Sequence, residues 1–158
     1  MMTLSYKRIL AAVDGSDEAE WAFQKAAGIA KRNNAVLNLI YVVDTRSFTG
    51  VKLHEPDIEE QAFDYGKELL DSYKKEALAA GIAEVNVFVT AGSPKKSISR
   101  DYAKRVEADL IVCGASGLNA VERYLMGSVS HHIVRNSSCD VLVVRKTEAE
   151  PKTSEILY

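Results

Sequence analysis

The stretch of this chain most suggestive of binding chemistry is GASGLNAVERYLMGS, residues 114–128. It holds Gly114 and Gly117, and ten residues later Gly127 with Ser128. Because glycine has no side chain, a glycine turn lets backbone N–H groups approach a ligand closely and adopts positive φ at little cost. Ser128 is placed to cap a helix, and a helix N-terminus attracts anions. The pattern favours an anion site that could hold successive phosphates.

Two familiar phosphate motifs do not fit this stretch. No Gly-Lys-Ser/Thr follows, as a Walker A loop requires, and the GxGxxG of a dinucleotide fold is absent. A purely structural interpretation also stays open, in which Gly117 breaks a strand and Gly127 kinks a helix. The spacing of the glycines alone does not decide between these interpretations.

The elements that must position these residues alternate regularly along the chain. Five short runs are rich in β-branched and apolar residues and mostly lack in/out alternation, which is typical of strands buried on both faces. They are residues 9–13, 36–43, 85–89, 109–114 and 140–144. Amphipathic helical segments separate them, the first capped by Ser16 and running to about residue 33. The order predicts an α/β fold, a doubly wound open parallel sheet with helices on both faces.

This fold class predicts where a ligand binds. In open α/β sheets, ligands lie beyond the carboxyl ends of the strands, where the strand order reverses. Two unusual turns stand at such ends, VDGSD after the first strand and CGASGLN after the fourth. If these two strands are neighbours, Asp14 and Gly114 flank one crevice. Residues 44–56 form a longer connection than the fold needs, which predicts a surface loop or a lid.

Composition narrows the class of protein. With 158 residues, 47% hydrophobic and 27% charged, the chain suits one domain, expected over 1–145, followed by a polar tail at 146–158. A net charge of -2 provides no basic field for nucleic acid, and no apolar run reaches membrane-spanning length. The two cysteines lie in apolar runs and predict buried thiols. We expect a cytoplasmic protein with neither nucleic acid nor membrane as partner.

The complete pattern resembles a known family. Gly114-x-x-Gly117, nine residues, then Gly127-Ser128, with DLIVCG before and VLVV after, is similar to the ATP-binding signature of the universal stress protein family, and ILAAVDGSD resembles that family's opening. The resemblance covers about residues 5–145 and implies a five-stranded sheet of order 3-2-1-4-5. The family often has Cys-Pro-Val before its last strand, whereas Asp140 follows Cys139 here, which puts details of a dimer edge in doubt.

The resemblance also implies a nucleotide site, residue by residue. Adenine and ribose would lie at Ala12, Asp14 and Val42. The phosphates would lie against Gly114, Ala115, Ser116, Gly117, Leu118, Asn119, Gly127, Ser128, Val129 and Ser130. A divalent ion, Mg²⁺ or Mn²⁺, would be held by phosphate oxygens and water with no direct protein ligand. His131 and His132 are adjacent on a helix and so cannot share a metal.

Three functions are compared. The first is an ATP-binding regulatory protein, with the choice among ATP, ADP and AMP left open, acting on an unidentified protein partner as a homodimer through residues 140–144. The second is a slow ATPase or phosphotransferase using the same pocket, for which the sequence offers no catalytic residue. The third is a nucleotide-free structural dimer whose glycines serve only turns. Nucleotide affinity and turnover of the purified protein distinguish them.

Overall fold

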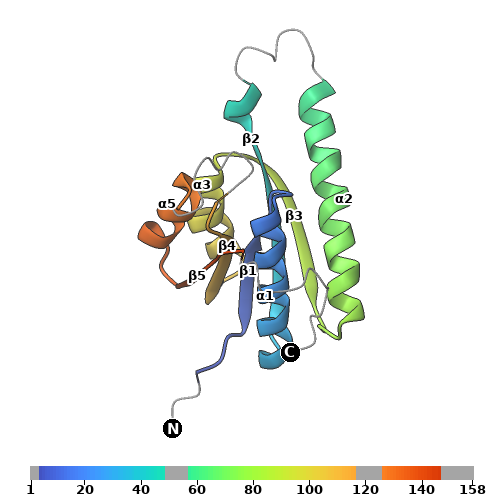
Figure 1. Ribbon diagram of the computed structural model, residues 1–158, viewed down its shortest axis with the longest axis vertical. Helices are drawn as coiled ribbons and strands as arrows, with labels where there is room; N and C mark the ends of the chain where they lie inside the picture. Colours follow the sequence, from blue (N-terminus) through green and yellow to red (C-terminus); the bar gives the residue numbers. More distant parts are fainter. Residues whose placement is uncertain (1–3, 49–56, 117–125, 147–158) are drawn as a thin grey trace.

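The computed structural model describes residues 4–48, 57–116 and 126–146 (Figure 1). The first half contains β1 (Arg8–Ala12), α1 (Asp17–Asn33), β2 (Val36–Asp44), a 3-10 turn (Thr45–Phe48) and α2 (Asp57–Ala79). The second half contains β3 (Val85–Gly92), α3 (Pro94–Lys96), a π-helical segment (Ser97–Tyr102), α4 (Ala103–Arg105), β4 (Leu110–Gly114), α5 (Ser128–Asn136) and β5 (Asp140–Val144). All five predicted strands are therefore confirmed within a few residues.

The strands form one parallel sheet of order β3-β2-β1-β4-β5. β1 lies at its centre and pairs on one side with β2 and on the other with β4, where Ala11 is opposite Val112. The chain builds the sheet outward from β1 to β3 and then returns to add β4 and β5 on the other side. The predicted doubly wound topology is confirmed, and the strand order reverses between β1 and β4.

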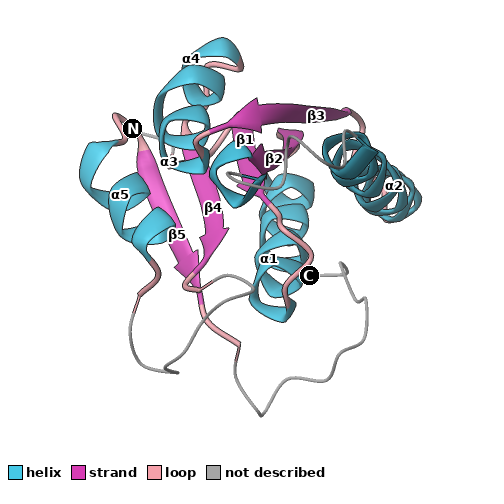
Figure 2. Cartoon of the chain, turned by 90° about the horizontal axis from the view of Figure 1, so that it is seen from above, coloured by secondary structure: helices cyan, strands magenta, loops and turns pink. Residues whose placement is uncertain are grey.

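The sheet separates two layers of helices, as Figure 2 shows. α1 and α2 cover one face, and α3, α4 and α5 cover the other. α1 begins as predicted, since the Ser16 side chain accepts a hydrogen bond from the Ala19 N–H at 3.2 Å. It ends at Asn34, a left-handed cap with φ 53°. Local capping residues thus set both ends of α1.

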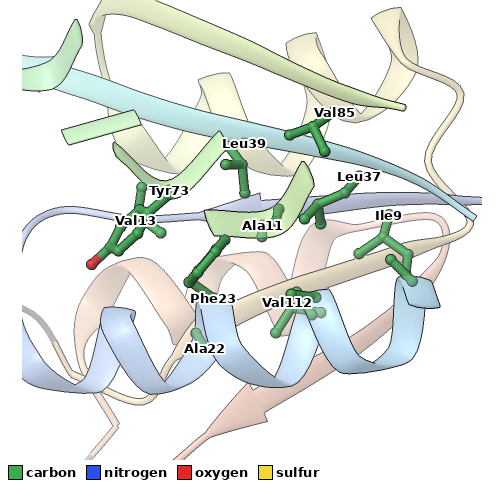
Figure 3. Packing of buried hydrophobic residues seen from close by; sticks show 14 of the residues in the cluster. Ile9, Ala11, Val13, Ala22, Phe23, Leu37, Leu39, Tyr73, Val85 and Val112 are labelled. Atoms are coloured by element: carbon green, nitrogen blue, oxygen red, sulfur yellow. The ribbon is translucent and has the colours of Figure 1, made fainter. Parts of the chain in front are cut away.

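The larger core lies between the sheet and the α1–α2 layer (Figure 3). Phe23 of α1 is fully buried and stacks on Tyr73 of α2, with ring centroids 4.3 Å apart. Beneath them lie Ala11 of β1 and Leu39 of β2, both fully buried. Burying a side chain the size of Phe23 contributes about 1.5–3 kcal/mol. This packing holds α1 and α2 against the same face of the sheet.

None of the helices in the described part of the chain combines the length and apolar character that a membrane span needs. Cys113 is buried as predicted, whereas Cys139 is only half-buried because it lies just before the edge strand β5. The predicted tail lies outside the described residues from 147 onward, as do residues 49–56 of the long connection.

Candidate functional site at the carboxyl ends of β1 and β4

The turn after β1 is built by its own side chains. One carboxylate oxygen of Asp14, Oδ1, accepts hydrogen bonds from the backbone N–H of Ser16 at 2.9 Å and from its hydroxyl at 2.5 Å. Gly15 has φ +86°, a left-handed conformation that side-chain-bearing residues rarely adopt. The turn therefore fixes Asp14 at the start of α1, as a turn-forming residue whose proposed role toward a ligand stays a prediction.

The end of β4 is packed directly against the first turn of α1. A Cβ on Gly114 would lie 3.1 Å from both the carbonyl carbon and the Cβ of Glu18, and 3.2 Å from the Ala19 nitrogen. Gly114 does not have positive φ, in contrast to Gly15. Its missing side chain therefore lets α1 approach β4 closely, and the expected role of Gly114 beside a ligand stays a prediction.

Glu18 fills the space next to Ser116, the second residue after β4. Its Oε2 accepts hydrogen bonds from both the backbone N–H and the hydroxyl of Ser116, each at 2.8 Å. Between Gly114 and Ser116, the Ala115 N–H donates to the Val144 carbonyl at 2.8 Å, so the pairing with β5 continues one residue further. A carboxylate of α1 therefore occupies the donors of a residue expected to bind phosphate.

The chain returns to the same point at the start of α5. The Gly127 N–H donates to the Ala115 carbonyl at 2.7 Å, and the Ser130 hydroxyl donates to the same oxygen at 2.8 Å. Gly127 also approaches Ser116 closely, because a Cβ on Gly127 would lie 3.5 Å from the Ser116 Cα. The excursion that begins after Ser116 therefore starts and ends side by side.

The expectation that Ser128 caps α5 is wrong. Gly127 is the N-cap, with φ −63° and ψ 159°, and Ser128 is the first helical residue. The chain stays extended through Gly127 because this residue is hydrogen-bonded back to Ala115. No side chain caps the helix, and its first turn holds no acidic residue.

The first N–H groups of α5 are consequently available to a ligand. His131 is the residue whose N–H donates to the Gly127 carbonyl, at 3.0 Å. The N–H groups of Ser128, Val129 and Ser130 precede it, and such groups have no acceptor within their own helix. Together with the helix dipole they favour an anion at this position.

The structure describes some of the remaining predicted residues and not others. Ala12 and Val42 are half-buried and pack against the cluster beneath α3 to α5, at the carboxyl ends of β1 and β2. Gly117, Leu118 and Asn119 lie outside the described residues. Ala12, Asp14, Ala115, Gly127 and the start of α5 do meet at one edge of the sheet, since β1 and β4 are parallel neighbours.

Two side chains at this edge were not identified from the sequence. Glu18 is an acidic residue in the first turn of α1, and Tyr65 lies on α2. In the structure Tyr65 is 50% exposed, and a Cβ on Gly15 would overlap its hydroxyl. Its ring meets Tyr41 edge-on at 5.9 Å, and burial, followed by the nearby Tyr65 and Asp14, raises the pKa of Tyr41. No local sequence pattern predicts the contact of Glu18 with Ser116 or that of Tyr65 with Tyr41.

The charged groups here do not form a metal-binding cluster. Within the described ranges, no three His, Cys, Asp or Glu side chains are grouped so that they could hold a metal ion. Burial raises the pKa of Cys113, the nearest thiol to this edge, to about 12, so it is protonated at neutral pH and a poor nucleophile. What the arrangement offers is hydrogen-bond donors, a carboxylate and a hydroxyl.

The fold and the position of this edge define a doubly wound α/β protein whose candidate site lies at its topological switch point. The sequence profile of the Universal stress protein family matches residues 5–145. The chain belongs to the universal stress protein family, which confirms the resemblance seen in the glycine pattern.

Similar proteins support this assignment. A protein of Staphylococcus epidermidis that carries the name "Putative universal stress protein" is 50% identical over 145 residues, 92% of this chain and 87% of that protein. The structure of universal stress protein UspA from Lactobacillus plantarum is 32% identical with a TM-score of 0.80, covering 90% of this chain and all of the other. A universal stress protein solved in complex with cAMP is 26% identical with a TM-score of 0.70, covering 90% of this chain and 99% of that one.

Proposed function

We propose that this chain binds an adenine nucleotide, ATP in the first place, between the β1 turn and the start of α5, and that it acts as a regulatory protein. One observation carries the proposal: the uncapped N-terminus of α5 is held beside Ser116 by the 2.7 Å hydrogen bond from Gly127 to Ala115. The first N–H groups of α5 thereby lie beside the end of β4, and α5 itself carries no acidic residue. Such a position suits phosphate groups.

The residues present fit a nucleotide. The phosphates would accept hydrogen bonds from the N–H groups of α5, and Gly127 would leave room for them. Adenine and ribose would contact the half-buried Ala12 and Val42, with Asp14 as a hydrogen-bond acceptor. Bound ATP with Mg²⁺ or Mn²⁺ would supply linked phosphates and a cation held on them. The family member in complex with cAMP supports an adenine nucleotide as the ligand class.

Calorimetric titration with ATP, ADP and AMP in Mg²⁺ tests the proposal. Gly127→Ala adds a methyl group at ordinary contact distance from Ala115, and Gly127→Val adds more bulk in the same place. We expect affinity to fall in that order, while Arg135→Ala, exposed on the last turn of α5, binds as the wild type does. Absence of binding to all three nucleotides, or wild-type affinity in Gly127→Val, would contradict it.

A phosphotransferase is the second candidate, because the structure supplies a base that sequence reasoning did not find. The Ser116 hydroxyl donates to the Glu18 carboxylate at 2.8 Å, within reach for proton transfer. The test is single-turnover hydrolysis of labelled ATP, together with mass analysis of Ser116 for phosphate. A hydrolysis rate near the ~10 s⁻¹ of a typical enzyme that is lost in Ser116→Ala would show that the protein is an enzyme. We expect turnover to be very slow or absent.

A homodimer through residues 140–144 is part of the proposal. β5 is an edge strand, paired with β4 alone among the described residues, and its three central residues are only partly buried. An uncovered apolar edge favours pairing with a second strand. Light scattering at micromolar concentration should give twice the mass of the chain, and a monomer would contradict the dimer without affecting the nucleotide site.

A further inference from the structure

The contact between Glu18 and Ser116 places a carboxylate at the candidate site. Glu18 and Ser116 are 98 residues apart in sequence, and both hydrogen bonds from Ser116 end on one carboxylate oxygen. Close packing holds Glu18 at this position, because Gly114 has no side chain and lets the backbone of Glu18 lie against the end of β4. The positive end of the α1 helix dipole also stabilises the negative charge of Glu18 at this position.

The two sides of the site differ in charge. The first turn of α1 carries Asp17, Glu18 and Glu20, whereas the first turn of α5 carries no acid. Lys146 balances Asp17 at 3.0 Å. The carboxylate that accepts the hydrogen bonds of Ser116 is therefore a negative charge on the α1 side of the candidate site, next to the residue that Gly127 approaches.

A bare phosphate cannot share these donors with Glu18. A phosphate oxygen that accepted the Ser116 N–H would lie next to the Glu18 carboxylate, and like charges at contact distance repel strongly where solvent is partly excluded. A divalent cation bound by the phosphates lowers their negative charge and so weakens this repulsion.

We propose that Glu18 makes the site selective for nucleotide that carries a divalent cation over free nucleotide, by occupying the Ser116 donors and repelling uncompensated phosphate. This inference rests on the proposed nucleotide site and names the form of ligand that the site takes. Glu18 acts here as a specificity-determining residue, and its effect depends on the charge of the ligand.

Calorimetry on three proteins tests this selectivity. Wild type, Glu18→Gln and Glu20→Gln are titrated with ATP in Mg²⁺, with ATP in EDTA, and with uncharged adenosine. Glu20→Gln is the matched control, the same change in the same helical turn at an exposed position. In EDTA we expect Glu18→Gln to bind ATP at least about tenfold more tightly than wild type. In Mg²⁺ the gain should largely vanish, and adenosine should bind all three proteins alike.

A second measurement needs no nucleotide. The backbone amide resonance of Ser116 in the free protein should move in Glu18→Ala, which removes the acceptor, and stay in place in Glu20→Ala. An unmoved Ser116 amide in Glu18→Ala would show that the contact is absent in solution and would overturn the proposal.

The titrations separate two kinds of failure. Equal ATP affinity of wild type and Glu18→Gln in EDTA, or an equal gain for adenosine, overturns the selectivity and leaves the nucleotide site standing. If folded wild type and Glu18→Gln bind none of the ligands in either buffer, the proposed function fails and the selectivity fails with it.

Discussion

Replacing Gly114 by alanine should destabilise the protein through the contact between β4 and α1. The added Cβ would lie 3.1 Å from the Glu18 carbonyl carbon and 3.2 Å from the Ala19 nitrogen. Both are backbone atoms of a helix whose inner face is buried, so the neighbour cannot rotate away. The helix must instead shift by a few tenths of an ångström.

The magnitude follows from two opposing effects. Overpacking a well-packed interior costs about 1–3 kcal/mol. Against this, glycine to alanine at an ordinary φ stabilises by about 0.4–1 kcal/mol, because the unfolded chain loses freedom. The middle of the two ranges gives a net loss of about 1 kcal/mol in the free energy of unfolding, which for a chain of this size lowers Tm by about 2–4 °C.

Thermal and urea unfolding of Gly114→Ala measure this loss, with Gly127→Ala as the matched control. The Gly127 Cβ would meet the Ala115 oxygen at 3.4 Å, an ordinary contact, and its φ of −63° suits any residue. The control should therefore be as stable as wild type or more stable by up to about 1 kcal/mol. A Gly114→Ala protein as stable as Gly127→Ala would refute the packing role of Gly114.

Three further outcomes follow from the described contacts. Ser16→Ala should lose about 1 kcal/mol of stability in urea unfolding, because it removes the cap on Ala19; an unchanged midpoint would contradict the cap. Cys113, whose pKa burial raises to about 12, should resist alkylation in the native state while the half-buried Cys139 reacts first, as mass analysis of a time course would detect; faster labelling of Cys113 would count against its burial. Burial, and then the nearby Glu20 and Glu76, raises the pKa of Tyr73 from 10.0 to about 12. The unfolded chain then loses this proton first, so the contribution of Tyr73 to stability is complete below pH 10 and is lost between pH 10 and about 12. Tyr73→Phe should lose less stability over that range, and a parallel decline in both proteins would argue against the shift.

The strands and the first helix could be predicted because their causes are local or nearly so, and the fold class then indicated the edge of the sheet at which to expect a ligand. Apolar runs mark buried strands, and the capping bond of Ser16 spans only three residues. Alternation of strands and helices then leaves few topologies. The resemblance to the family supplied the order that makes β1 and β4 neighbours, which the structure confirms.

The roles of particular residues at the site depended on distances that no local pattern contains. The sequence marked Gly114 as unusual, yet only the close approach of α1 to β4 decided that its missing side chain makes room for a helix. Ser128 has the composition of a cap, but the hydrogen bond from Gly127 to Ala115 keeps the chain extended one residue longer and moves the cap.

The sequence by itself therefore determined the elements, their order and the edge where they present backbone donors, because hydrophobic periodicity and capping act over a few residues. The tertiary structure alone decided what faces those donors. Glu18 meets Ser116 across 98 residues, because packing of α1 on the sheet, and no interaction along the chain, brings that carboxylate to the end of β4.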